Sequence, residues 1–110
     1  MNVSIKLGAL LLLIPLMSTI LKAEASVFEG FSLEDCKKIE LVAKKIMEDR
    51  QGGKSMSKFL TDIEDLDGPA KAISTNIVIS AYDERRNYTS VYKKQAIDNF
   101  SEKWFKICYL

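Results

Sequence analysis

The chain contains no histidine among its 110 residues, and it has only two cysteines and two prolines. Without histidine it lacks the commonest general base, the His-containing catalytic triads and the ligand set of most zinc sites. Its 16 basic and 15 acidic side chains leave a net charge of +1, so it also lacks the basic field of a nucleic-acid-binding protein. From these absences we expect a protein that is not an enzyme, that holds no metal or cofactor and that binds no nucleic acid.

Only one long apolar run occurs, and it lies at the start of the chain. A lysine precedes an almost wholly apolar segment at residues 7–21, and Ala23-Glu24-Ala25 follows it as an A-x-A cleavage site. The run is about 15 residues long, shorter than the roughly 20 that span a bilayer, and Pro15 interrupts it. We expect residues 1–25 to be a signal peptide that meets the membrane only transiently, and residues 26–110 to form a secreted or periplasmic domain. A retained membrane anchor is the alternative.

The two cysteines are Cys36 and Cys108, and export would place them where disulfide bonds persist. We expect one internal bond, which in the chain-entropy model adds about 4 kcal/mol to a small domain with a thin core. Two free thiols or an intermolecular bridge are the alternatives. Once oxidised, the cysteines serve neither as a thiolate nucleophile nor as metal ligands.

Apolar side chains recur at helical spacing in four segments, at about 33–50, 55–66, 70–83 and 90–108. The expected N-terminal caps are Ser32 for the first segment, Ser55 or Ser57 for the second and Ser90 for the fourth. The pattern predicts an all-α domain, namely a small four-helix bundle of up-down-up-down topology stapled by one disulfide. In that topology the first turn of the first helix and the last turn of the fourth lie at the same end, as the disulfide requires.

The apolar stripe of each segment predicts its buried face. Members near the ends of the stripes are Leu33, Leu66, Tyr82, and Tyr92 or the stem of Lys93, and the aromatic members of the last segment are Phe100 and Trp104. The run Ile77-Val78-Ile79 is β-prone, so the third segment is the one in which a strand competes with a helix.

Several sequence segments, which together extend over nearly all of the expected domain, resemble those of a known family. They are the early Cys36, the stretch Ile46-Met47-Glu48-Asp49-Arg50-Gln51-Gly52-Gly53 followed by Met56, the segment Ser80-Ala81-Tyr82, and the final Ala96, Ile97, Phe100, Trp104 and Cys108. In these features the chain resembles a family of small exported two-cysteine helical proteins of bacteriophages and proteobacteria. The resemblance implies a phage or bacterial origin and a periplasmic location, and it implies no activity or catalytic residue.

Tyrosine and arginine are concentrated around the segment that joins the last two expected helices. Five of them lie within eleven positions: Tyr82, Arg85, Arg86, Tyr88 and Tyr92. These side chains dominate binding hot spots because they bury a large area and keep a polar group available. We predict that the cluster binds a partner protein, and that Arg85, Arg86 and Tyr88 lie on the surface. The competing interpretation is that Tyr82 and Tyr92 belong partly to the core and that the arginines are simply solvated.

One glycine-containing motif is similar to the end of a phosphate-binding loop. Gly52-Gly53-Lys54-Ser55 matches the final residues of G-x-x-x-x-G-K-S, but Glu48 stands where the motif requires its first glycine. The acidic side chain would repel a phosphate, and a helix rather than a strand is expected before the loop. We therefore interpret the motif as a turn between helices.

Four acidic residues, Asp62, Glu64, Asp65 and Asp67, lie close together before Gly68. Alignment of Gly68 with the invariant glycine of a calcium loop puts Ile63 and Ser74 at its first and last ligand positions, where acids belong, so a loop of that type is rejected. A solvated acidic face is expected, with a weak cation site or a surface for a basic partner as the alternatives.

Three functions compete. The first is an exported protein-binding module of the cell envelope, which would act as an inhibitor or superinfection-exclusion factor on an envelope or phage protein. The second is a cell-wall-acting enzyme that uses carboxylates such as Glu40 and Glu48, but eight residues of one helix separate them by roughly 12 Å, wider than glycosidase geometry allows. The third is a structural or stress-protective periplasmic protein without a specific partner.

The cysteine pattern and the cleavage site together predict the mass of the exported protein. Under non-reducing conditions its mass should equal that of residues 26–110 less two hydrogens, because the signal has been removed and one internal bond has formed. Intact-mass spectrometry measures both changes. Two thiols that alkylate freely in the native exported protein would contradict the disulfide.

Overall fold

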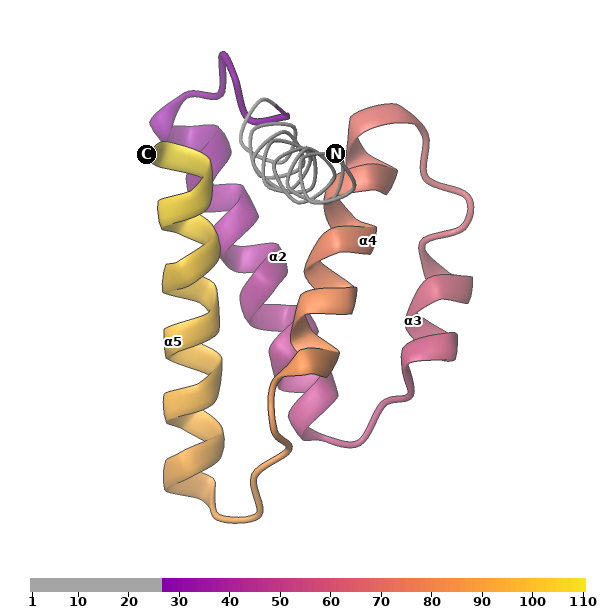
Figure 1. Ribbon diagram of the computed structural model, residues 1–110, viewed down its shortest axis with the longest axis vertical. Coiled ribbons are helices and arrows are strands. Elements are labelled where there is room, and N and C mark those ends of the chain that lie inside the picture. Colours follow the sequence, from indigo (N-terminus) through magenta and orange to yellow (C-terminus); the bar gives the residue numbers. More distant parts are fainter. Residues whose placement is uncertain (1–26) are drawn as a thin grey trace, which may run out of the picture.

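The computed structural model describes residues 27–110, so the expected signal peptide at residues 1–25 lies outside the described part of the chain. Within it the helices follow in the order α2 (Leu33–Gln51), α3 (Met56–Asp62), α4 (Gly68–Asp83) and α5 (Ser90–Tyr109) (Figure 1). No strand occurs in residues 27–110, and the β-prone run Ile77-Val78-Ile79 is helical. The predicted all-α class is confirmed.

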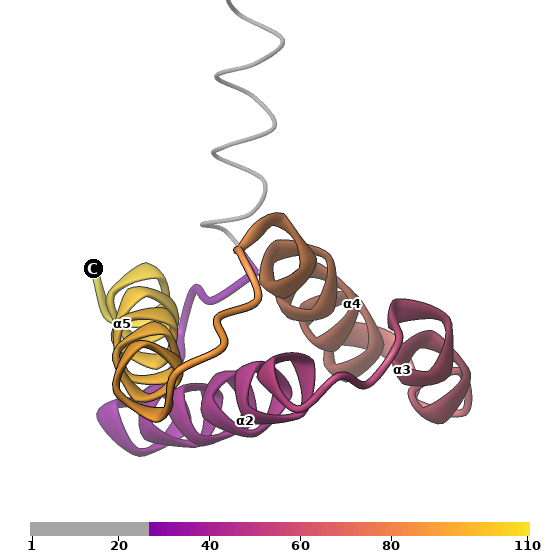
Figure 2. The same ribbon diagram turned by 90° about the horizontal axis from the view of Figure 1, so that it is seen from below.

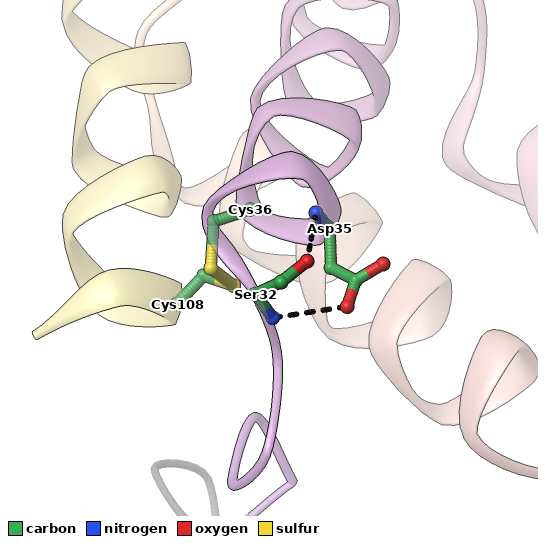
Figure 3. The surroundings of a disulfide bond; sticks show 4 residues. All are labelled: Ser32, Asp35, Cys36 and Cys108. Carbon is green, nitrogen blue, oxygen red and sulfur yellow. Dashed lines mark hydrogen bonds between the residues drawn. A yellow bond between two sulfur atoms is a disulfide. The ribbon is translucent and has the colours of Figure 1, made fainter.

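The start of α2 is set by a local exchange of hydrogen bonds. The Asp35 amide donates to Ser32 Oγ over 3.2 Å, and the Ser32 amide donates to Asp35 Oδ2 over 3.0 Å (Figure 3). This capping box satisfies two amide groups that the helix itself leaves unpaired. The hydrogen bond from the Ser32 amide lowers the pKa of the Asp35 carboxyl, so this carboxyl stays ionised. Its negative charge lies in the first turn of α2, where it interacts favourably with the positive end of the helix dipole.

Two predicted helix boundaries are wrong. α3 ends at Asp62 and not near 66, because the chain turns after Ile63, where the Leu66 amide bonds to the Ile63 carbonyl at 3.1 Å. α4 begins at Gly68, close to the start expected at about 70, with Pro69 in its first turn. Thr89 caps α5 instead of Ser90, since Thr89 is the last residue with extended backbone and its side chain accepts a hydrogen bond from the Tyr92 amide.

The four helices alternate in direction, as the up-down-up-down topology requires (Figure 1). α5 and α4 both pack against α2, and α3 packs against α4, so α2 lies between α5 and α4 (Figure 2). The lead at residues 27–31 enters over α2 between α4 and α5 (Figure 2). Its Phe28 is buried, with its ring edge-on to Trp104 at 6.4 Å between centroids. The lead therefore contributes to the core beside the helices.

The core contains side chains from every helix. Its buried apolar members include Cys36, Ile39, Ala43, Ile46, Met47, Phe59, Ile73, Ile77, Val78, Ala81, Phe100 and Trp104. Burial of Phe100 and Trp104 confirms the prediction for them. Leu33 and Leu66 were expected to be buried, but they are 44% and 40% exposed. Of the alternatives Tyr92 and the stem of Lys93, Tyr92 is 60% exposed and Lys93 is half-buried. Leu33 and Tyr92 lie in the first turns of their helices and Leu66 lies outside any helix, so less of the neighbouring structure covers them.

A disulfide joins Cys36 near the start of α2 to Cys108 near the end of α5 (Figure 3). The two Cα atoms lie 5.5 Å apart although 72 positions separate the residues in sequence, and both side chains are buried. The predicted internal bond is confirmed, and it lies at one end of the bundle as the topology demands. Within residues 27–110, none of the helices has the length and apolar character needed to cross a membrane.

Removal of the disulfide should strongly destabilise the domain. Cys36→Ser combined with Cys108→Ser reopens a loop whose closure the chain-entropy model values at about 4 kcal/mol. The melting temperature should fall by more than about 10 °C, since about 1 kcal/mol shifts a domain of this size by 4–8 °C. Thermal unfolding followed by circular dichroism measures the change, and reduced wild-type protein is the matched control. Equal melting of the oxidised wild type and the double variant would contradict this stabilisation.

Candidate functional site

The segment of residues 84–89 between α4 and α5, the connector, is held by the side chain of one residue of α2. Gln51 is 1% exposed, and its amide Nε2 donates to the Arg85 carbonyl over 2.9 Å. Its Oε1 accepts from the Asn87 amide over 2.7 Å. Both ends of the buried amide are thus satisfied by connector backbone, and we call these two bonds the Gln51 network. They fix the conformation of the connector because a buried polar group without partners would cost about 1–3 kcal/mol.

Arg50 and Arg86 reinforce this attachment from its two sides. Arg50 Nη2 donates to the Glu84 carbonyl over 3.3 Å, and Arg86 Nε donates to the Gln51 carbonyl over 3.2 Å. The Arg86 guanidinium lies against Gly53, whose φ is +98° and where an added Cβ would come within 2.9 Å of Nη2. Gly53 therefore provides both the turn after α2 and the space in which Arg86 lies.

Tyr82 is part of this packing and is half-buried. Its ring stands edge-on to Phe59 at 6.2 Å, the Arg50 guanidinium lies 4.6 Å above its centroid, and its hydroxyl donates to the Lys54 carbonyl. Burial raises the pKa of the phenol, against the opposing effect of the nearby cations. Tyr82 thus joins α4 to α3 and to the turn after α2, as the competing interpretation of the sequence predicted for it.

Arg85, Tyr88 and Tyr92 differ from Tyr82, because their side chains point to solvent. Tyr88 is 91% exposed and Tyr92 is 60% exposed, and Arg85 is exposed as well. In residues 27–110 no hydrogen bond or ion pair involves the Arg85 guanidinium or either tyrosine hydroxyl. They line a concavity of about 410 Å³. The residues that line it, which we call the connector surface, are Arg85, Arg86, Asn87, Tyr88, Thr89 and Tyr92.

The motif Gly52-Gly53-Lys54-Ser55 is a turn between α2 and α3, as predicted. The Lys54 ammonium lies 2.7 Å from Asp62 Oδ2 and 3.9 Å from Asp49 Oδ2. The hydrogen bond with Asp62 raises the pKa of Lys54 and lowers that of Asp62. Lys54 is therefore neutralised by two carboxylates of the same domain, and Ser55 caps α3 through the Lys58 amide.

The acidic residues before Gly68 do not gather into a ligand set. Asp62 pairs with Lys54, while Glu64, Asp65 and Asp67 are exposed to solvent. Because α3 ends at Asp62, Asp67 stands at the N-cap position of α4, where its charge is favourable to the helix dipole. The described residues contain no group of three or more acidic or cysteine side chains that could hold a metal ion.

Comparisons with protein families, with curated proteins and with solved structures found no match to this chain.

Gln51 is the important residue that the sequence reasoning did not identify. It follows Ala43 and Met47 at intervals of four, so it continues the buried stripe of α2 with a polar side chain. A buried glutamine side chain needs hydrogen-bond partners inside the protein, so a glutamine on the buried face of a helix is the sequence signal that could have identified Gln51.

Replacement of Gln51 should destabilise the protein and loosen the connector. Gln51→Leu keeps the volume but leaves the Arg85 carbonyl and the Asn87 amide without their partner, at a cost of about 2–3 kcal/mol. Chemical denaturation measures the loss, and amide hydrogen exchange at Asn87 should become faster. Gln95→Leu on the exposed face of α5 is the control and should change stability by about 0.5 kcal/mol or less. Equal effects of the two substitutions would show that Gln51 does not hold the connector.

Proposed function

We propose that this protein is an exported binding module that recognises a partner protein in the periplasm through its connector surface. The observation that carries the proposal is the contrast within the connector. Its backbone is fixed by the Gln51 network, whereas Arg85, Tyr88 and Tyr92 make no polar side-chain contact within residues 27–110 and project to solvent.

Such an arrangement favours recognition on energetic grounds. A loop that is already ordered loses little conformational entropy on binding, so more of its contact energy appears as affinity. A tyrosine has few rotatable bonds and a large ring, so it gains contact area at a low entropic cost. Tyr88 is 91% exposed, so its ring contributes little to the packing of residues 27–110 and stays available to a partner.

Export is supported by the apolar run at residues 7–21 with its A-x-A site, and by the disulfide of the domain. In the periplasm the connector surface would face envelope proteins. If the protein has the phage origin that the family resemblance implies, its binding to an envelope or phage protein would inhibit that protein or exclude a second infection.

The test is a variant that alters recognition without altering the fold. Arg85→Ala, Tyr88→Ala and Tyr92→Ala are combined, while Arg86 and Tyr82 are kept because both make contacts within the domain. Chemical cross-linking in periplasmic extract identifies the partner of the wild type, and titration of that purified partner gives the affinity. We expect a loss of about 2 kcal/mol or more, roughly thirtyfold, with melting within a few degrees of wild type.

A matched control removes the same kinds of groups elsewhere. Lys44→Ala, Leu41→Ala and Tyr109→Ala together delete a cation, an exposed apolar side chain and a phenol away from the connector. This variant should bind like the wild type. The proposal fails if the connector variant binds the partner as tightly as the wild type, or if the control loses as much affinity.

A further inference from the structure

The two arginines of the connector surface carry charges that nothing in the described part of the chain neutralises. The ion pairs of residues 27–110 involve Lys37, Lys45, Lys54 and Lys106, and none involves Arg85 or Arg86. Lys54 shows the opposite situation, since Asp49 and Asp62 lie beside it. The bonds that Arg86 makes leave its charge in place, because Nε donates to a neutral carbonyl.

The lining of the concavity has one sign of charge. Arg85 and Arg86 are its only charged members, and the others are two tyrosines, an asparagine and a threonine. The first turn of α5, which begins beside it after Thr89, contains no acidic residue that would offset the positive end of the helix dipole. An anion entering the concavity would therefore meet two positively charged residues and no acidic one.

The shape and the neighbours of the arginines favour a carboxylate on a protein chain. A guanidinium presents parallel N–H donors that match the two oxygens of a carboxylate, so adjacent arginines suit a Glu or Asp side chain. Tyr88 and Tyr92 line the same concavity and are exposed, so their rings are available to apolar groups next to that acid.

A membrane surface fits these residues less well. A concavity accepts a convex group, whereas a bilayer is flat on this scale, and the exposed aromatic side chains here are tyrosines and not the Phe or Trp of an inserted helix.

We infer that the connector surface binds an acidic segment of its protein partner, with a Glu or Asp carboxylate held between Arg85 and Arg86 and apolar neighbours against Tyr88 and Tyr92. This inference rests on the proposed function and names the chemistry of the partner. The attraction is electrostatic and acts between solvent-exposed charges, so its strength falls as the salt concentration rises.

The test uses two labelled peptides with the exported, disulfide-bonded protein. One is a short peptide rich in glutamate and leucine, and the other has every glutamate replaced by glutamine. Fluorescence anisotropy at low salt should show binding of the first and at least tenfold weaker binding of the second. Arg85→Glu should weaken binding of the glutamate peptide at least tenfold, and added salt should weaken it in the wild type. Lys71→Glu, an equal charge change on an exposed residue at the opposite end of α4, is the control and should leave binding unchanged within a factor of two.

Three results would overturn the inference. The two peptides could bind equally, Arg85→Glu and Lys71→Glu could have the same effect, or phosphatidylglycerol vesicles could bind where the glutamate peptide does not. If the combined alanine variant still loses its cross-linked partner in any of these cases, the proposed function stands and only the acidic chemistry is wrong. If that variant keeps its partner while the glutamate peptide binds, the proposed function is the part that fails.

Discussion

The pairing of α2 with α5 is the constraint on which the remaining structure depends. At one end of the pair the Cys36–Cys108 bond joins the first turn of α2 to the last turn of α5. At the other end Gln51, the last residue of α2, bonds to the backbone that leads into α5. Because both ends are attached, α5 cannot slide along α2 without breaking either a covalent bond or buried hydrogen bonds. α4 packs on the other side of α2, and α3 packs on α4.

The polar attachment differs from the covalent one in what it specifies. A disulfide reduces the conformational freedom of the unfolded chain, and the loop it closes here is long. The buried Gln51 amide instead demands a donor and an acceptor at defined positions, and the connector supplies both only in one conformation. The first attachment therefore contributes mainly stability, and the second determines the course of the chain between α4 and α5.

The arginines around the connector have two different roles. Arg50 covers the Tyr82 ring and bonds to the connector, so its side chain is part of the packing. Arg85 contributes only its carbonyl, and its guanidinium is left to solvent. Arg86 combines the roles, because its Nε is bonded to the Gln51 carbonyl and its guanidinium lies against Gly53, while the residue also lines the concavity. A cluster of like residues in sequence thus separates into structural and available members once the chain is folded.

The sequence alone determined the helical class, the Ser32 cap, the disulfide and the burial of Phe100 and Trp104. These follow from the helical periodicity, from the serine and acidic residues at the start of α2 and from a single possible cysteine pair, whereas the choice of Ser55 over Ser57 as the cap of α3 was left to the structure. It also located the Tyr and Arg cluster around the connector. Only the tertiary structure decided that Tyr82 is packed while Tyr92 is exposed, and that Gln51 holds the connector. The physical reason is that these outcomes depend on contacts between distant positions, such as the bond from the Asn87 amide to Gln51 across 36 positions, which no local pattern encodes.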